Sequence, residues 1–575
     1  MIRESRRMKK SRKKSSIKRV FFILFLLLVI IASLYLYRKY SFTNKRADLK
    51  EYLHVTGDEV AIFLNDEDKS TNDVEDGIKM RALKSHDTVY VPLSFVKGYI
   101  NNRFYFAKDI NKILYCLPYE IQSRGDSDIH QIGNCPYVIF KDEPYLLIDY
   151  VKDFTNIRYD SYLDEDSKRI YIYTDWDKES IAYMKGKEAA RLHGGNKSPI
   201  VTDLKKGEEV KVLDRMTKWI KVKTSDGYIG YIRKSKINKE IERIPISSYI
   251  EVTRNDIKMS EKPVVGFHQV LSNYSASQLP ELLKNTKGMN VIAPTWFVIK
   301  NNDGDIRSVA NDKYSLHCHG RKLKVWATVN NFDLGNIDEK LVFSNTMTRR
   351  KMIDKILREV SVNNLDGINL DIEQLPDDAG EDYTEFVREL SIELNKVGCM
   401  LSVDTYIPYN FNKQYNLKEY NDFCDYVIIM AYDEHYSGSK VAGSVSSINY
   451  VRDAINLSLA SINKEKLIIG LPFYTRIWTT KVDGTVSSIA GAAETLEQSA
   501  IAQGLKFTFD TETCQNYGTK TTLDGDLVEC WMEDDTSLGY KMVEIRNADL
   551  AGTAAWKLTQ ERDKSFSIIS LNNDN

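Results

Sequence analysis

The sequence predicts a multidomain protein whose C-terminal half is an α/β domain, a closed (β/α)8 TIM barrel. Before it we expect a small β-barrel domain and an α+β repeat domain, with one transmembrane helix at the N-terminus. Three observations predict this architecture. The chain has 575 residues, too many for one compact domain. A long apolar run follows a basic segment at the N-terminus. After about residue 262, eight strand-like segments alternate with segments of helical periodicity.

The N-terminal segment has the features of a membrane anchor. Residues 1–19 hold ten Lys or Arg and one Glu, and residues 20–37, VFFILFLLLVIIASLYLY, follow without a charge. Eighteen residues at helical rise span about 27 Å, enough to cross a hydrocarbon core. The basic flank predicts a cytoplasmic tail at residues 1–19 and extracellular domains after the helix. A cleaved signal peptide is the alternative, but no small-x-small site follows the apolar run.

Residues 50–176 contain a weak internal repeat. Residues 87–118 and 143–176 share one layout: a short strand, a helical turn, a strand, a polar turn and another strand. Repeats of this size are typical of paired small modules. They resemble the copper amine oxidase N-terminal-like domain of bacterial surface proteins. The segment has no His-rich ligand set, so we expect a spacer or wall-binding platform rather than a copper site.

Residues 185–240 predict a small β-barrel, because short β-rich runs are separated by KKGE and SDG turns. The segment resembles the bacterial SH3-like domain, which commonly accompanies cell-wall enzymes. Its aromatic residues could line a ligand groove or fill the core of the barrel; they are Trp219, Tyr228 and Tyr231.

Residues 262–573 predict the (β/α)8 barrel. Strands that alternate with helical segments indicate βαβ units and a parallel sheet, and eight of them indicate closure. Residues 479–550 are too long for a simple crossover and are expected to cap one rim. The eight strand-like runs are PVVGFHQV, MNVIAPTWFVI, LKVWATVNN, LDGINLDIE, MLSVDTYIP, YVIIMAYD, LIIGLPFYTRIW and AGTAAWKL.

One of these runs, LDGINLDIEQLP at residues 365–376, alternates strictly between apolar and polar residues. Both faces of a barrel strand are covered, so Asn369, Asp371 and Glu373 are expected to point into the barrel. Glu373 lies nearest the C-terminal rim, where barrel active sites are built. The Cα atoms of Asp371 and Glu373 are about 6–7 Å apart along the strand. Two carboxyl groups this close in a partly dry site keep one proton near neutral pH, as glycoside cleavage requires.

The run Asp366 to Glu373 resembles the DGxDxDxE signature of glycoside hydrolase family 18, the chitinase-like family. Asn369 stands where that family usually has its middle aspartate. Three further runs resemble family motifs in the same order: MAYD at 430–433, GLPFYTR at 470–476, and AAWKL around Trp556. The resemblance covers residues 262–573 and is closest to the cell-wall N-acetylglucosaminidase branch.

The resemblance implies retaining hydrolysis of β-1,4-linked N-acetylglucosamine glycans, assisted by the substrate. The 2-acetamido oxygen of the sugar would attack the anomeric carbon while Glu373 protonates the leaving oxygen. Asp371 would orient the acetamido N–H, and Tyr432 would hold its carbonyl. No cofactor and no metal are implied. The substrate-binding residues that the resemblance implies are Asp366, Asn369, Met430, Asp433, Tyr474, Arg476 and Trp556.

Together these features predict a membrane-anchored extracellular glycoside hydrolase whose partner is an N-acetylglucosamine-containing polysaccharide. Peptidoglycan is the first choice and chitin-like oligomers the second; no nucleic acid is expected. The alternative is a lectin-like surface protein that binds glycans without cleaving them, although the acid Glu373 is retained. Because the amide of Asn369 cannot share a proton with Asp371, we expect activity with an altered pH profile.

Overall fold

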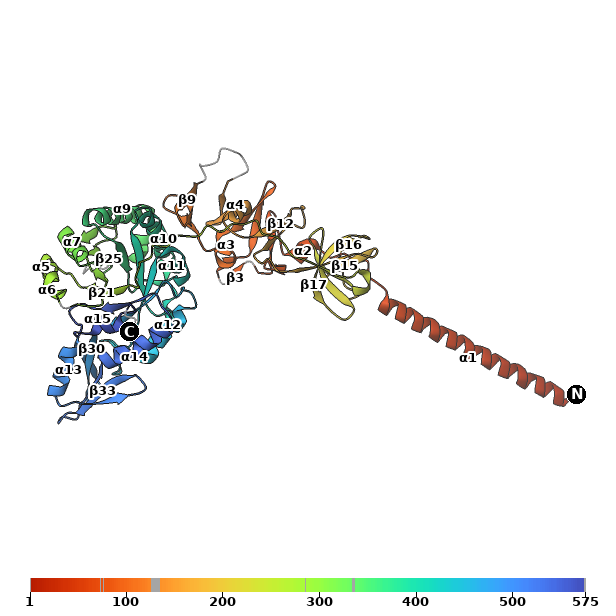
Figure 1. Cartoon of the computed structure of the whole chain (residues 1–575). Coiled ribbons are helices and arrows are strands. Elements are labelled where there is room, and N and C mark those ends of the chain that lie inside the picture. Colours follow the sequence, from red (N-terminus) through yellow and green to blue (C-terminus); the bar gives the residue numbers. More distant parts are fainter. Residues whose placement is uncertain are drawn as a thin grey trace. The chain divides into compact units, whose positions relative to one another are not determined.

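The computed structural model describes residues 2–72, 74–75, 77–125, 135–284, 286–332 and 337–572, with side chains from residue 18 onward except that of Asn273. The chain forms two compact units (Figure 1). The first contains residues 1–104 and 125–250, and the second contains residues 105–124 and 251–575. A short internal segment therefore belongs to the same unit as the C-terminal half of the chain.

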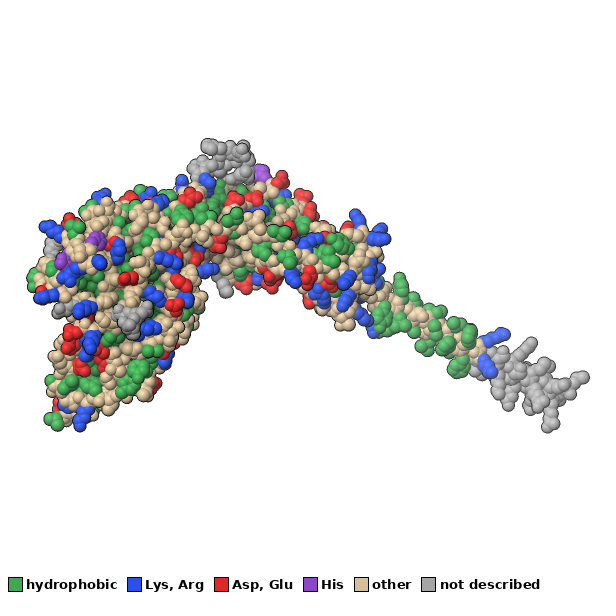
Figure 2. Space-filling view, viewed as in Figure 1, with side chains coloured by type: hydrophobic (Ala, Val, Ile, Leu, Met, Phe, Trp, Pro, Cys, Tyr) green, Lys and Arg blue, Asp and Glu red, His purple; other side chains and the backbone are tan. Residues whose placement is uncertain are grey.

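The N-terminal helix α1 covers Ile2–Tyr40. Its segment Lys18–Tyr40 is 23 residues long, and no part of it is buried in the protein. Figure 2 shows this segment covered by hydrophobic side chains. Among the described residues it is the one helix long and apolar enough to cross a membrane, and a signal sequence would have the same properties.

The chain that follows α1 is bound along the edge of a sheet. This edge segment, residues 41–47, runs beside the start of β16 (Ile200–Leu204). Ala47 N donates to Ile200 O (2.8 Å), and Ile200 N donates to Lys45 O (2.8 Å). The edge segment is thus fixed to the first domain almost as soon as α1 ends.

The SH3-like region of the first unit is a seven-stranded antiparallel sheet in the order β16-β15-β19-β18-β17-β14-β20. Its apolar side chains, Ile220 and Val222 among them, form one core, as expected of a small β-barrel. The remaining strand bounds are β14 (Glu179–Tyr183), β15 (Glu188–Arg191), β17 (Glu209–Arg215), β18 (Trp219–Thr224), β19 (Ile229–Arg233) and β20 (Ile241–Arg243).

The other large sheet of the first unit has the order β10-β11-β6-β5-β1-β13-β12, and β2 pairs with β1. A short helix, α2 (Leu49–Leu53), precedes it, and β3 (Val74–Glu75) pairs with β4 (Ile78–Lys79). The sheet is built from β1 (Glu59–Leu64), β2 (Glu67–Asp68), β5 (Arg81–Ser85), β6 (Thr88–Pro92), β10 (Tyr137–Phe140), β11 (Glu143–Leu147), β12 (Arg158–Tyr162) and β13 (Arg169–Tyr173).

The two predicted repeats have the same order of elements. The first is β6, α3 (Leu93–Tyr99), β7 (Phe104–Ala107) and β8 (Lys112–Leu117), and the second is β11, α4 (Ile148–Asp153), β12 and β13. The two repeats differ in their final hairpins. In the second repeat, β13 pairs with β1 and stays in the first unit. In the first repeat, β7 and β8 instead join β9 (Glu120–Gly125) in a separate three-stranded sheet.

Residues 105–124 of that sheet, here called the donated hairpin, belong to the second unit. They pack on helix α10 (Gly380–Lys396) of the barrel. Tyr105 OH donates to Asp382 Oδ1 (2.5 Å), and Cys116 Sγ lies 3.4 Å from Glu385 Oε1. Both contacts are buried, so the donated hairpin covers an acidic face of α10.

Eight parallel strands close the barrel, in the order β22-β21-β35-β29-β28-β27-β26-β25, and β22 also pairs with β25. Each of the eight predicted runs contains one of them. A hairpin of β23 (Phe297–Ile299) and β24 (Ile306–Ser308) extends the sheet beside β25. The barrel strands are β21 (Val264–His268), β22 (Val291–Pro294), β25 (Lys324–Asn330), β26 (Gly367–Asp371), β27 (Met400–Thr405), β28 (Tyr426–Met430), β29 (Leu467–Pro472) and β35 (Gly552–Trp556).

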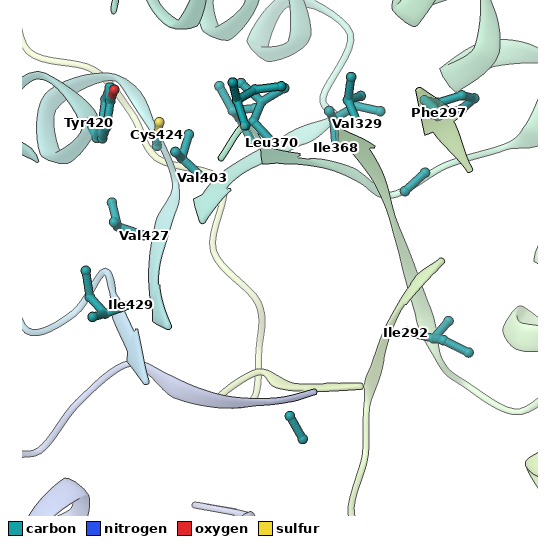
Figure 3. Packing of buried hydrophobic residues seen from close by; sticks show 14 of the residues in the cluster. Ile292, Phe297, Val329, Ile368, Leu370, Val403, Tyr420, Cys424, Val427 and Ile429 are labelled. Carbon is teal, nitrogen blue, oxygen red and sulfur yellow. The ribbon is translucent and has the colours of Figure 1, made fainter. Parts of the chain in front are cut away.

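Helices cover the outside of the barrel and bury one face of each strand. Ile368 and Leu370 of β26, with Val403 of β27, lie in this outer apolar layer (Figure 3). A separate apolar cluster lies inside the ring and includes Trp326 and Ile428. The helices are α5 (Asn273–Ser277), α6 (Leu279–Leu282), α7 (Asp312–Gly320), α8 (Glu339–Ser344), α9 (Thr346–Asn363), α10, α11 (Leu417–Phe423), α12 (Ile448–Ser458), α14 (Asp535–Asn547) and α15 (Ser565–Ile569).

The long insertion between β29 and β35 forms a five-stranded antiparallel sheet in the order β31-β30-β34-β33-β32. It leaves the barrel at the carboxyl end of β29, the rim at which barrel active sites are built. Its elements are β30 (Tyr474–Thr480), β31 (Val486–Ala492), α13 (Ala493–Ala502), β32 (Lys506–Asp510), β33 (Gln515–Thr521) and β34 (Leu527–Met532).

Candidate active site

The polar face of β26 points into the barrel. Ile368 and Leu370 belong to the outer layer, and side chains alternate along a strand, so Asn369 and Asp371 face inward. Asn369 is fully buried and Asp371 is 5 % exposed. Glu373 follows on the same face just beyond the carboxyl end of the strand and is half-buried. The predicted orientation of the three side chains therefore agrees with the structure.

Glu373 is held by residues from the two neighbouring strands. Tyr406, just after β27, donates its hydroxyl to Glu373 Oε2 (2.6 Å). Asn331, just after β25, accepts from Glu373 N (3.1 Å) and donates to Glu373 O (2.9 Å). Burial raises the pKa of the Glu373 carboxyl; the Tyr406 hydrogen bond opposes this, and the carboxylate of Asp433 adds to it. The result is an acid that keeps its proton more readily than an exposed glutamate.

Asp371 lies deeper in the barrel. Burial raises the pKa of its carboxyl well above the usual range, and the neighbouring carboxyl groups of Asp404 and Glu373 raise it further. Its Oδ1 atom is buried and has no hydrogen-bond partner among the described residues. Because leaving a buried polar atom unpaired costs about 1–3 kcal/mol, this oxygen is positioned to receive a donor from a ligand.

Asn369 connects β26 to β27. Its Nδ2 donates to Ser402 Oγ (3.0 Å) and to Asp404 Oδ1 (2.7 Å). Sequence reasoning missed Asp404 and Tyr406. A signal was present, because Ser402, Asp404 and Tyr406 alternate with apolar or branched residues just as the polar residues of β26 do.

Tyr432 lies two residues beyond Met430, the last residue of β28. Burial raises the pKa of Tyr432 well above its usual range, and the carboxyl groups of Asp371, Asp404 and Glu373 raise it further. Its hydroxyl therefore stays protonated and lies near all three acids. Met430 itself is buried at the end of the strand.

The other predicted residues line the same rim. Tyr474 OH donates to Asp433 Oδ1 (2.5 Å), and Arg476 Nη2 lies 4.0 Å from the same oxygen. These contacts connect the insertion to the loop after β28. Trp556 ends β35, is partly exposed, and lies with its ring 5.8 Å from that of Phe267.

Asp366 lies apart from these residues. It precedes β26, five residues before Asp371, which is about 16–17 Å along a strand. Its carboxylate accepts from Lys324 Nζ (2.7 Å) and Val325 N (2.9 Å) and contacts His319 Nε2 (2.8 Å). The amino-end face of such barrels serves stability, so we correct the expectation that Asp366 binds substrate.

The described residues contain no group of three or more His, Cys, Asp or Glu side chains placed to hold a metal ion. What the site offers is acid–base chemistry: a half-buried acid at the rim, a second carboxyl group below it, and a protonated tyrosine near both.

The sequence profile of glycosyl hydrolases family 18 matches residues 264–561, which include all eight barrel strands and the insertion. The chain belongs to this family. A bacterial SH3 domain profile matches residues 191–238. The resemblance of residues 50–176 to the copper amine oxidase N-terminal-like domain stays a prediction.

Among relatives of this family-18 chain is the "Putative sporulation-specific glycosylase YdhD" of Bacillus subtilis, 27 % identical over 266 residues, or 45 % of this chain and 63 % of the relative. The "Cortical fragment-lytic enzyme" of B. subtilis is 22 % identical over 240 residues, which are 40 % of this chain and 55 % of that relative. The chain thus spans less than two thirds of the length of either relative.

A solved structure supports the fold of this family-18 barrel. The C-terminal domain of a "putative chitinase" from Desulfitobacterium hafniense aligns with a TM-score of 0.50 and 19 % identity, over 54 % of this chain and 99 % of that domain. At this identity the similarity concerns the fold alone.

Proposed function

We propose that the protein is a membrane-anchored extracellular glycoside hydrolase that cleaves β-1,4-linked N-acetylglucosamine glycans with retention of configuration. One observation carries the proposal: the half-buried acid Glu373 stands two residues beyond the buried carboxyl group of Asp371, on the same face of the barrel. Membership of family 18 supports glycan hydrolysis as the reaction class.

In the first step, Glu373 donates its proton to the glycosidic oxygen as the bond from that oxygen to C1 breaks. The raised pKa of Glu373 supports this role, since a general acid must still hold its proton near the working pH. The acetamido carbonyl oxygen of the same sugar forms a new bond to C1 and gives an oxazolinium ion. Asp371 Oδ1, unpaired among the described residues, accepts the acetamido N–H.

In the second step, water attacks C1 and its proton passes to the Glu373 carboxylate. The bond between C1 and the acetamido oxygen breaks, and the acetamido group is restored. Two displacements at C1 retain its configuration. This is the substrate-assisted exception to the two-carboxylate pattern of retaining glycosidases.

Two aromatic residues position the sugar in this proposal. The protonated hydroxyl of Tyr432 donates to the acetamido carbonyl and keeps it in line with C1, since burial prevents ionisation of the phenol. The partly exposed face of Trp556 supports the sugar ring from the end of β35. Stacking of an apolar sugar face on an aromatic ring excludes water from the reacting bond.

Peptidoglycan is the proposed substrate, ahead of chitin-like oligomers. An apolar N-terminal helix would hold the enzyme at the cell surface, with its basic flank in the cytoplasm. The bacterial SH3 domain and the similarity to a cortical fragment-lytic enzyme also favour a cell-wall glycan.

The test compares full-length protein in detergent micelles with two variants, Glu373→Gln and the control Glu281→Gln. The side chain of Glu281, on α6, is 76 % exposed and lies outside the site. Each protein is incubated with purified peptidoglycan and with N-acetylglucosamine oligomers, and new reducing ends are identified by mass spectrometry.

The native protein and Glu281→Gln should release fragments ending in N-acetylglucosamine, from peptidoglycan in preference to the oligomers. Glu373→Gln should be slower by about 10²–10⁴-fold, the usual contribution of general acid–base catalysis. If the native protein binds both glycans and cleaves neither, the non-catalytic glycan-binding alternative is correct instead.

A further inference from the structure

A third buried carboxyl group lies beside Asp371, on the neighbouring strand. Leu370 of β26 pairs with Val403 of β27, so the next residues, Asp371 and Asp404, lie side by side on the inner face of the barrel. Neighbouring strands are about 4.8 Å apart, which leaves no room for a shielding group between the two side chains. Asp404 is only 3 % exposed.

Asn369 fixes the position of Asp404. An amide nitrogen has two protons, and both are used here: one reaches Ser402 Oγ at 3.0 Å and the other reaches Asp404 Oδ1 at 2.7 Å. A carboxylate at position 369 could not donate to Asp404 and would add a further negative charge to the same buried layer. The barrel interior therefore accommodates the amide of Asn369 next to the carboxyl group of Asp404.

The electrostatics of the site agree with this geometry. Apart from burial, the Asp404 carboxyl is the largest contributor to the raised pKa of Asp371, ahead of Glu373. Burial also raises the pKa of Asp404, with a further contribution from Glu373, while the hydrogen bond from Asn369 opposes it. Two adjacent buried carboxyl groups cannot both ionise at neutral pH, so the pair retains a proton.

We propose that Asp404 is a positioning residue that shares one proton with Asp371, and that Asn369 holds Asp404 in place for this exchange. The inference rests on the proposed function. As the oxazolinium cation forms next to Asp371, its positive charge favours the ionised form of that carboxyl group. The proton of Asp371 then passes to Asp404, and it returns when water opens the oxazolinium ion. Asp404 acts through Asp371 and does not touch the sugar.

The experiment moves the carboxyl group from position 404 on β27 to position 369 on β26. Full-length native protein is compared with Asp404→Asn, Asn369→Asp, the double variant Asn369→Asp with Asp404→Asn, and Ser402→Ala. The last removes the other hydrogen-bond partner of the Asn369 amide and serves as the matched control. For each protein, kcat and KM for N-acetylglucosamine oligomers are measured as a function of pH.

We expect Asp404→Asn to lower kcat by about 100-fold with little change in KM, within the range of proton-transfer effects. The acidic limb of its kcat profile should move to lower pH, because loss of the neighbouring Asp404 carboxyl group lowers the pKa of Asp371. Asn369→Asp should also be slow. The kcat of the double variant should be at least tenfold higher than that of either single variant. The kcat of Ser402→Ala should stay within about threefold of the native value.

A second readout does not depend on turnover. An acid whose pKa is raised by folding makes the native state less stable as pH rises above its unfolded value, about 3.9 for aspartate. The free energy of unfolding of the native protein should therefore fall with rising pH more steeply than that of Asp404→Asn. If Asp404 instead stayed ionised in the native state and had only a structural role, the stability lost in Asp404→Asn would not vary with pH above the unfolded pKa of aspartate.

The proposal is overturned if Asp404→Asn keeps the native kcat and pH profile, or if the double variant is no faster than the slower single variant. It is also overturned if the unfolding curves of native protein and Asp404→Asn depend on pH in the same way. A native protein that cleaves no glycan, yet shows the expected difference in unfolding, would refute the proposed function and leave the shared proton standing.

Discussion

A buried ion pair under the donated hairpin gives a quantitative test of the fold. Arg349 of α9 has a fully buried side chain, and that of Glu389 on α10 is 6 % exposed. Arg349 Nη2 lies 2.8 Å from Glu389 Oε1, and Nε lies 3.2 Å from Oε2. Arg349 Nη1 also donates to Phe343 O (2.7 Å) and to Tyr105 OH (3.4 Å). One guanidinium group of α9 thus contacts α8, α10 and the donated hairpin.

The substitution Arg349→Met leaves a buried carboxyl group without its cation and the Phe343 carbonyl without this donor. Removing one partner of a buried ion pair costs about 3–5 kcal/mol of unfolding free energy. Replacing both partners with apolar residues of similar size costs much less. The unfolding free energy of the double variant Arg349→Met with Glu389→Leu should therefore lie within about 2 kcal/mol of the native value. The control Arg350→Met, whose native side chain is 56 % exposed, should change stability by no more than about 0.5 kcal/mol.

The assay is urea unfolding followed by tryptophan fluorescence. Trp296, Trp326 and Trp478 are all fully buried in the second unit and report on its unfolding. If the unfolding free energy of Arg349→Met lies within about 1 kcal/mol of the native value, the ion pair of Arg349 and Glu389 does not stabilise the barrel as argued. The same conclusion follows if the double variant is as unstable as the single one.

Two further predictions concern the site and the anchor. In the native protein, the hydrogen bond from Tyr406 to Glu373 Oε2 lowers the pKa of the Glu373 carboxyl, and Tyr406→Phe removes this bond. The pKa of Glu373 should therefore rise and the alkaline limb of the kcat profile should move to higher pH, while kcat at the optimum falls about tenfold because a charge-assisted hydrogen bond is lost. An alkaline limb that stays in place would mean that Glu373 is not the acid. Deletion of residues 1–40 should move the protein from the membrane fraction to the soluble fraction with hydrolysis retained. Recovery of the deleted form in the membrane fraction would contradict the anchor.

The barrel could be predicted because its signal is local. Each apolar run has the length of a strand, and helical periodicity separates the runs, so no knowledge of packing partners is needed. The inward face of β26 is visible for the same reason: Asn369, Asp371 and Glu373 interrupt a strand that a barrel would otherwise keep apolar. Family motifs then placed Tyr432 and Trp556 on the same rim.

The misses have physical causes. Asp404 and Tyr406 carry the same alternation as β26 but match no family motif, so the prediction passed over them. Asp366 is part of the signature, yet its place at the amino end of the strand puts it with Lys324 and His319. The donated hairpin could not be predicted, since Tyr105 and Asp382 lie 277 positions apart and no local pattern specifies which distant helix a hairpin covers.

The edge segment has a consequence for where the enzyme can work. A flexible tether lets an anchored domain explore a radius that grows with the square root of tether length. Here the backbone of Lys45 and Ala47 is already bonded to Ile200, so hardly any tether remains after α1 ends at Tyr40. On the proposed topology the SH3-like domain is stationed at the membrane surface. If peptidoglycan is the substrate, as proposed, that domain would meet the innermost wall layer first, and its position would select among the glycan strands.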